Sequence, residues 1–211
     1  MTRIADKTFR FGAAEGPMIL IHAGAGDSCG ETPEQAEQIR VDLKKAALAG
    51  FDALKKTDDA SEAVCAAIHV LEDATEFNAG RGAALTEDGK AQMDACLMTG
   101  DGDAGSVFGV TCAKHPIDAA KAVKECTKHV CMDNPSEELL GQLGVETVEN
   151  EYFITDARRE MLAKAKEDGD GGVIVMSPHG EAVVAFNSEM MNFAFADDDQ
   201  AIPFPLEDGL E

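Results

Sequence analysis

The feature that most constrains the fold is a glycine-rich stretch, Glu76–Gly82, which reads E-F-N-A-G-R-G. Gly80 and Gly82 can adopt positive φ angles without steric cost, and asparagine tolerates left-handed backbone angles. The apolar run Ala91–Met98 that follows has the length of a strand. The sequence therefore predicts a sharply folded loop, Leu71–Gly82, that leads into a strand. The carbonyls of such a loop converge, which suits a bound cation or another backbone segment, although many glycine-rich turns are only turns.

The same stretch carries a family motif. Beyond Gly82 the chain continues as L-T-x-x-G-x-x-x-M-D-A from Leu85 to Ala95, and the whole pattern resembles the isoaspartyl peptidase/L-asparaginase family, the plant-type asparaginases among the N-terminal-nucleophile hydrolases. Three further blocks resemble the same family. Ile19–Gly26 resembles its first strand and I-H-G-G-A-G loop, with Ala23 in place of the first glycine. Glu149–Phe153 with Arg158 and Arg159 resembles the end of its α-subunit, and Gly171–Met191 resembles the very end of its β-subunit.

The resemblance implies an αββα sandwich, an α/β layered fold in which two sheets lie between helical layers. The chain then forms a single asparaginase-like domain, residues 1–211, with residues 1–168 resembling the α-subunit and residues 171–211 the C-terminal end of the β-subunit. A long block separates these parts in the family, whereas here they are adjacent. We therefore expect a central block of strands to be missing, which would expose sheet edges and apolar faces that a homo-oligomer or a protein partner could cover.

The family hydrolyses L-asparagine and β-aspartyl peptides through a threonine whose own free amine acts as the base, and that amine arises when the precursor cuts itself at a Gly-Thr junction. Here Gly169-Asp170-Gly171 stands at that place, and none of the threonines follows a glycine. An aspartate has no hydroxyl to activate. The sequence as written thus predicts a catalytically inactive relative. The alternatives are a non-catalytic structural or interaction protein that reuses the scaffold, and an active enzyme if the sequence omits a segment.

The resemblance also implies that the Asn78 side chain supports the surroundings of the nucleophile. Separately, it implies a structural sodium ion. The expected ligands are backbone carbonyls, which suit a hard cation: Leu71, Glu72, Ala74, Phe77, Ala79 and Arg81. An ordered loop without an ion is the alternative. The five histidines are too scattered for their spacing to pair any of them with a nucleophile or to form a metal site.

Composition excludes several partners. The 40 acidic and 18 basic residues give a formal charge of −22, which repels nucleic acid phosphates and anionic membrane surfaces. No apolar stretch approaches the roughly 18 residues of a membrane span. The six cysteines include no C-x-x-C pair, which favours buried, reduced thiols and a cytoplasmic location: Cys29, Cys65, Cys96, Cys112, Cys126 and Cys131.

Local signals predict the remaining elements. Strands are expected at Pro17–His22, Ala91–Met98, Ser106–Cys112, Val173–Met176 and Glu181–Ala185. A turn is expected at Ala23–Gly30, and hairpin turns are expected at Thr99–Gly105 and Ser177–Gly180. A helix is expected from Thr32 to about Lys56, with Thr32 and Gln35 placed to form a capping box. Another is expected from Asp59, with an apolar face of Val64, Ala67, Ile68 and Leu71, and a third from His115, with Ala119, Ala120, Val123 and Val130. Shorter helices are expected over Ser136–Leu143 and from Thr155 to Lys166. The acidic tail from Ala196, with its two prolines, is expected to be loosely held.

Overall fold

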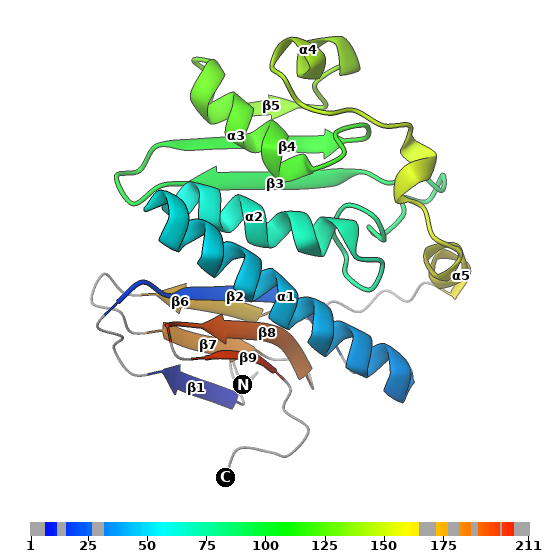
Figure 1. Cartoon of the computed structure of the whole chain (residues 1–211). Helices are drawn as coiled ribbons and strands as arrows, with labels where there is room; N and C mark the ends of the chain where they lie inside the picture. Colours follow the sequence, from blue (N-terminus) through cyan, green and yellow to red (C-terminus); the bar gives the residue numbers. More distant parts are fainter. Residues whose placement is uncertain are drawn as a thin grey trace, which may run out of the picture. The chain divides into compact units, whose positions relative to one another are not determined.

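The computed structural model describes residues 7–11, 16–26, 32–164, 172–176, 182–186, 190–198 and 200–204 (Figure 1). The chain divides into two compact units, the first made of residues 1–70 and 167–211 and the second of residues 71–166. Both units contain helices and β-sheets, which confirms the predicted α/β class. The assignment of residues 1–211 to one domain stays a prediction.

The first unit contains the helix α1 (Pro33–Thr57), which begins as the sequence predicts. The Thr32 hydroxyl accepts a hydrogen bond from the Gln35 amide at 3.2 Å, and the Gln35 side chain accepts one from the Thr32 amide at 3.1 Å. This reciprocal pair is the expected capping box. The helix ends at Asp58, whose left-handed φ of 55° lets its amide bond back to the last turn.

The next helix, α2 (Ala60–Asp73), packs closely against α1. A Cβ atom at Gly50 of α1 would lie 2.8 Å from the Ala63 carbonyl oxygen, so only glycine fits there. Ala67 is buried on α2 as predicted, but Val64 is 38% exposed, which corrects the expected apolar face. The small Ala63 takes the buried place because the two helices approach too closely for valine.

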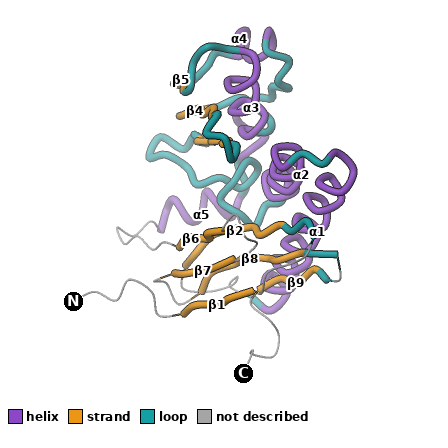
Figure 2. The backbone as a smooth tube through the Cα atoms, turned by 90° about the vertical axis from the view of Figure 1, so that its left-hand side faces the viewer, coloured by secondary structure: helices purple, strands orange, loops and turns teal. Residues whose placement is uncertain are grey.

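Two three-stranded antiparallel sheets complete the first unit (Figure 2). In the sheet order β1-β7-β6 and β2-β8-β9 the strands are β1 (Lys7–Phe11), β7 (Ala182–Phe186), β6 (Gly172–Met176), β2 (Ile19–Gly26), β8 (Met190–Ala196) and β9 (Ala201–Phe204). The predicted hairpin of β6 and β7 is confirmed. The sequence did not predict β1 or β8.

The core of this unit lies between the two sheets. Leu20, Phe193 and Phe195 from one sheet pack with Val184 of the other, and all four side chains are buried. The alternate residues of β8 face away from this cluster, among them Ala194 and Ala196, which are fully buried, and α1 packs against β8. The small side chains let the helix lie close to the sheet. The unit is thus layered as helix, sheet and sheet.

Two predictions for this unit are wrong. The predicted turn Ala23–Gly30 is strand as far as Gly26, because β2 continues its pairing with β8 through a shift of register between His22 and Ala25. The tail is not loose throughout, since β9 pairs with β8 and places Pro203 opposite Ala194. Pro203 is tolerated because β9 is an edge strand of its sheet. Residues 27–31 and 205–211 lie outside the described part.

The second unit is built on the sheet β3-β4-β5, in which β4 pairs antiparallel with β3 and parallel with β5. Its elements are β3 (Met93–Met98), β4 (Ala104–Val110), α3 (Pro116–Cys126), β5 (Cys131–Asp133), α4 (Glu137–Gln142), the 3₁₀ helix η1 (Asn150–Phe153) and α5 (Asp156–Lys164). The predicted hairpin of β3 and β4 is confirmed, as are the short helix after Ser136 and the helix after Thr155.

Helix α3 covers one face of β3 and β4 with small, fully buried side chains, among them the predicted Ala119, Ala120 and Val123. Val130, which was expected on this helix, lies beyond its end and is 64% exposed. The helix stops at Cys126 because Thr127 is extended and its hydroxyl donates a 2.8 Å bond to the Val123 carbonyl. The strand β5 was not predicted.

Candidate functional site

The loop that the sequence places at Leu71–Gly82 begins later in the structure. Helix α2 continues to Asp73, so Leu71 and Glu72 are helical and the loop proper starts at Ala74. Both residues are buried, Leu71 at 6% and Glu72 at 4% exposure. Their burial within the second unit explains why the helix continues past Leu71, where the loop was predicted to begin.

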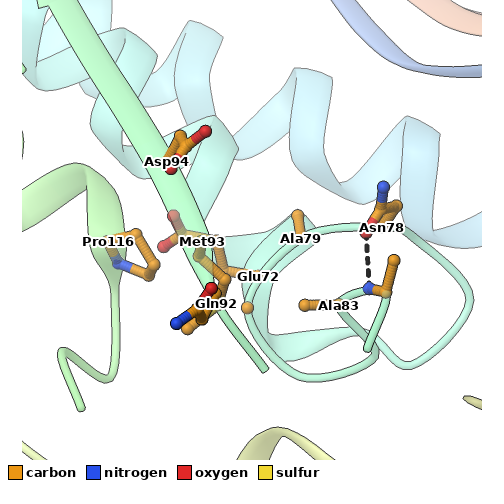
Figure 3. Close-up of a pocket in the computed structure, with 10 residues that line it drawn as sticks. Glu72, Asn78, Ala79, Ala83, Gln92, Met93, Asp94 and Pro116 are labelled. Carbon is orange, nitrogen blue, oxygen red and sulfur yellow. Dashed lines mark hydrogen bonds between the residues drawn. The ribbon is translucent and has the colours of Figure 1, made fainter. Parts of the chain in front are cut away.

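Backbone hydrogen bonds close the loop. The Arg81 amide donates a 2.7 Å bond to the Glu72 carbonyl, which brings the end of the loop back to the end of α2. Gly80 and Gly82 have φ angles of 47° and 102°, as predicted. Asn78 does not have the positive φ that the sequence allowed. Its side-chain oxygen instead accepts a 2.6 Å hydrogen bond from the Ala84 amide (Figure 3).

The Glu72 side chain anchors the loop to the start of α3. One carboxylate oxygen accepts a 3.1 Å bond from the Ile117 amide, and the other lies 3.0 Å from Nδ1 of His115. The hydrogen bond that the His115 ring donates to the Glu72 carboxylate raises the pKa of His115, and the nearby charges of Asp73 and Asp118 raise it further. Spacing could not reveal this pair, because 43 residues separate its members.

The segment Glu149–Phe153 holds the loop from its other side. The Gly82 amide donates a 2.9 Å bond to the Phe153 carbonyl, and the fully buried Phe153 ring packs against Ala83 and Ala91. Asn150 accepts a bond from the Ala91 amide at 3.1 Å and donates bonds of 2.8 Å to the carbonyls of Ala91 and Thr111. Two blocks that share a family resemblance are therefore neighbours in space.

Arg158 adds a further tie between α5 and the loop. Its Nε donates a hydrogen bond to the Gly82 carbonyl, and its Nη1 lies 3.2 Å from the Met161 sulfur. Burial lowers the pKa of the Arg158 guanidinium. The Thr155 hydroxyl accepts a 3.2 Å bond from the Arg158 amide and so caps the helix that carries it. The sequence predicted the Glu72 carbonyl as an ion ligand, but it gave no role in the site to the Glu72 carboxylate, to Asn150 or to Arg158.

A cavity of about 300 Å³ opens beside the loop (Figure 3). Its polar lining comes from the amides of Asn78 and Gln92 and the carboxylates of Asp94 and Glu72. Asp94 also accepts a 2.8 Å bond from the Gly109 amide, which fixes its position on β3. Among the described residues, those that line the cavity include no serine, threonine or cysteine.

The backbone of the loop partly fits the predicted sodium ion. A Cβ atom at Gly82 would lie 2.5 Å from the Thr75 carbonyl oxygen and 3.1 Å from that of Phe77, so these two oxygens face the same space. Phe77 is one of the six predicted ligands. The Glu72 carbonyl already accepts the Arg81 amide, which leaves it one lone pair. No group of three or more His, Cys, Asp or Glu residues in the described part could hold a metal.

The thiols and histidines outside the loop also differ from expectation. Cys65 is buried and Cys112 is half-buried, but Cys96, Cys126 and Cys131 are exposed, so the prediction of buried thiols is wrong for these three. Cys29 lies outside the described residues. His22 of β2 accepts a 3.3 Å bond from the Gly24 amide, and burial lowers the pKa of its ring. None of the helices described is long and apolar enough to cross a membrane.

Comparison with known proteins places these observations in context. A sequence profile described as asparaginase matches residues 15–170. The chain is 33% identical to an isoaspartyl peptidase/L-asparaginase of Bos taurus over 156 residues, 73% of this chain and 50% of that protein. It is 37% identical to a probable isoaspartyl peptidase/L-asparaginase 2 of Arabidopsis thaliana over 151 residues, 71% of this chain and 46% of that protein. It is 32% identical to a Homo sapiens isoaspartyl peptidase/L-asparaginase over 154 residues, 72% and 49% respectively. The chain thus spans about half the length of the curated relatives it matches.

Proposed function

The chain belongs to the asparaginase family, and from this membership we propose that it forms the framework of an L-asparagine and β-aspartyl peptide hydrolase but carries no catalytic nucleophile. One observation supports the proposal above all: no threonine in the 211 residues follows a glycine. The lining of the cavity is consistent with it, because the described residues that line it include no serine, threonine or cysteine. In this proposal Asn78 keeps the position from which, in its relatives, the corresponding side chain supports the surroundings of the nucleophile.

The chemistry leaves little room for a substitute. A nucleophile of this class needs its own α-amine as the base, and that amine is released only by cleavage of the preceding bond. Asp170, which takes the place of the nucleophile by resemblance, lies outside the described residues and has no hydroxyl. By the family resemblance, the block that this sequence lacks also carries the oxyanion site. Loss of a single oxyanion donor commonly costs about 10²–10³ in rate, so we expect loss of the nucleophile and the oxyanion site together to abolish turnover.

The test combines the mass and the activity of the protein purified from its native source. We expect a single species of 22.3 kDa under denaturing conditions and no aspartate release from L-asparagine or a β-aspartyl dipeptide, with an active family member assayed in parallel. Two fragments whose masses sum well above this value, together with aspartate release, would show that the natural polypeptide contains a nucleophile segment. Aspartate release by the intact 22.3 kDa chain would refute the proposal outright.

A second function, a non-catalytic structural or interaction role, draws support from exposed apolar side chains in the second unit. Met98 is 67%, Phe108 50% and Val130 64% exposed. We propose that a second copy or a protein partner covers them. Sedimentation of the purified chain should then reveal an oligomer or a retained partner, and Phe108→Asp should dissociate it. A wild-type chain that sediments as a monomer, free of partners, would contradict this role.

We also propose the sodium ion and the cytoplasmic location. Phe77 and the other predicted carbonyls would hold the ion, which would neutralise their converging dipoles. Because a ligand that binds only the folded state stabilises it, sodium chloride should raise the melting temperature above that in choline chloride of equal ionic strength. Equal melting temperatures would count against a sodium site. Fluorescent tagging of the protein in its native cell would test the location.

A further inference from the structure

Two hairpin turns in the second unit share one construction. In the first, Thr86–Lys90, the Gly89 amide donates a 2.8 Å bond to the Thr86 carbonyl, and the Thr86 amide donates a 2.9 Å bond to the Lys90 carbonyl. Gly89 has a φ of 78°, the left-handed conformation that closes a three-residue hairpin loop. The Thr86 hydroxyl donates to the Asp88 carboxylate, and the Lys90 ammonium lies 2.9 Å from its other oxygen.

The second turn, Thr99–Asp103, joins β3 to β4 and repeats these contacts. The Gly102 amide donates to the Thr99 carbonyl at 2.9 Å, the Thr99 amide donates to the Asp103 carbonyl at 2.9 Å, and Gly102 has a φ of 91°. The Thr99 hydroxyl again donates to a carboxylate, that of Asp101. Both turns therefore present an aspartate followed by a glycine, with a threonine two residues before the aspartate.

An aspartyl–glycyl bond is chemically vulnerable, because glycine has no side chain to shield its own backbone nitrogen, which follows the aspartate. That nitrogen attacks the side-chain carboxyl carbon, a new carbon–nitrogen bond forms, and a carboxyl oxygen leaves as water with the amide proton and the acid proton. Water then opens the five-membered imide at either carbonyl. One product is the original bond, and the other is a β-aspartyl linkage of equal mass with one more carbon in the main chain.

The contacts in both turns oppose each requirement of this reaction. The attack needs a protonated carboxyl, but the threonine hydroxyl stabilises the carboxylate and lowers the pKa of Asp88 and Asp101. It also needs a free amide nitrogen, but the amides of Gly89 and Gly102 are held by the threonine carbonyls. Burial does not protect either site, since Asp88 and Asp101 are both exposed.

We propose that Thr86 and Thr99 are protecting residues, which keep the bonds Asp88–Gly89 and Asp101–Gly102 from isomerising to β-aspartyl linkages. The protection matters for the fold, because an extra main-chain carbon at Asp101 would disrupt the turn that aligns β3 with β4. It would also disturb Asp94, which β3 presents to the cavity. This inference is independent of the proposed function, since it concerns the chemical stability of the chain itself.

The two turns serve as controls for each other. The variants Thr86→Val and Thr99→Val keep the shape of the side chain and remove its hydroxyl. After ageing of the folded proteins at neutral pH, β-aspartyl content is measured separately at Asp88 and Asp101 by fragmentation mass spectrometry of their peptides. Thr99→Val should raise the rate at Asp101 roughly fivefold to tenfold, the factor for one ordinary, solvent-exposed hydrogen bond, and leave Asp88 unchanged. Thr86→Val should do the reverse, with a smaller rise because Lys90 still holds the Asp88 carboxylate.

The conservative variants Thr86→Ser and Thr99→Ser should restore the wild-type rates, because serine keeps the hydroxyl. If a valine variant does not fold, the wild-type chain answers the question, since unfolding it in urea should accelerate isomerisation at both sites. Equal rates at Asp101 in the wild type and Thr99→Val would overturn the proposal. So would a rise of equal size at both aspartates in each variant, which would indicate general loosening, or wild-type rates that urea does not change.

Discussion

The substitution Glu72→Gln tests whether a single carboxylate fixes the glycine-rich loop. Glu72 is 4% exposed, and its two oxygens contact the Ile117 amide and the His115 ring. Glutamine has nearly the same shape and keeps one oxygen for the Ile117 amide, but it loses the charge that faces His115. The variant therefore removes the ionic part of the anchor and leaves most of the packing in place.

The structure sets the size of the effect. A hydrogen bond to a charged group is worth about 1.5–3 kcal/mol, so we expect Glu72→Gln to lower the free energy of unfolding by about 2 kcal/mol at mildly acidic pH. Glu72→Ala strips both partners and should cost about 3–5 kcal/mol, the usual result of leaving one member of a buried pair alone. The exposed Glu87 provides a control, because Glu87→Gln removes the same charge without removing any of these contacts.

The effect should depend on pH in a defined direction. The pKa of His115 is raised in the folded state, so protonated His115 stabilises the fold fully below its unfolded pKa of about 6.5. That stabilisation is lost as the pH rises through the folded pKa. The difference between wild type and Glu72→Gln should therefore be largest below pH 6.5 and shrink at alkaline pH. Asp73 and Asp118 also face His115 and should leave the variant a weak residual slope.

Urea unfolding followed by tyrosine fluorescence is the suitable assay. The chain has one tyrosine and no tryptophan, so the signal comes from Tyr152, which belongs to the second unit. The slope with denaturant should be the same in all variants if the unfolding remains cooperative. An unfolding free energy for Glu72→Gln equal to that for Glu87→Gln below pH 6.5 would refute the reasoning. A difference that stays constant from acidic to alkaline pH would refute its electrostatic part.

Substitutions at four other positions test further contacts. Gly82→Ala and Gly89→Ala both place an alanine at positive φ, which costs about 1–3 kcal/mol. Only the new Cβ atom of Gly82→Ala also meets a carbonyl oxygen, that of Thr75 at 2.5 Å, so this variant should lose more stability. Equal losses of unfolding free energy in urea would show that the loop is not crowded. Asn150→Ala removes three hydrogen bonds and should lower the unfolding free energy by about 3 kcal/mol in the same assay. A loss below about 1 kcal/mol would contradict the role of Asn150 in holding Ala91 and Thr111. Thr32→Ala should lower the stability of α1 by about 1 kcal/mol in thermal unfolding followed by circular dichroism, whereas Thr32→Ser should not.

Local chemistry made parts of the fold predictable from the sequence. The capping box at Thr32 and the hairpin turn before Asp103 depend on residues that are neighbours in the chain, so spacing alone identifies them. Strand β8 and strand β9 escaped prediction because their pairing, not their composition, makes them strands. Pro203 and the acidic residues around it suggested a loose tail, but an edge position in a sheet removes the objection to proline.

The candidate site was predictable only in part for a related reason. The glycines of the loop announce its positive φ angles, yet the groups that hold the loop come from elsewhere in the sequence. His115 is 43 residues from Glu72, and Asn150 is 59 residues from Ala91. Contacts over such separations leave no periodicity or spacing for sequence reasoning to detect. Resemblance located the block around Asn150, but it did not indicate that this block clamps the start of β3.

The contacts of the loop bear on what its motif means. Glu72 closes the loop with its carbonyl and anchors α3 with its carboxylate, while the Phe153 carbonyl holds Gly82 and the Ala84 amide occupies Asn78. Every one of these partners lies within residues 71–166, and none of them is a nucleophile. The second unit therefore has its own physical reasons to keep the motif. It follows that a well-formed loop does not by itself imply catalysis, and that activity must be judged from the nucleophile.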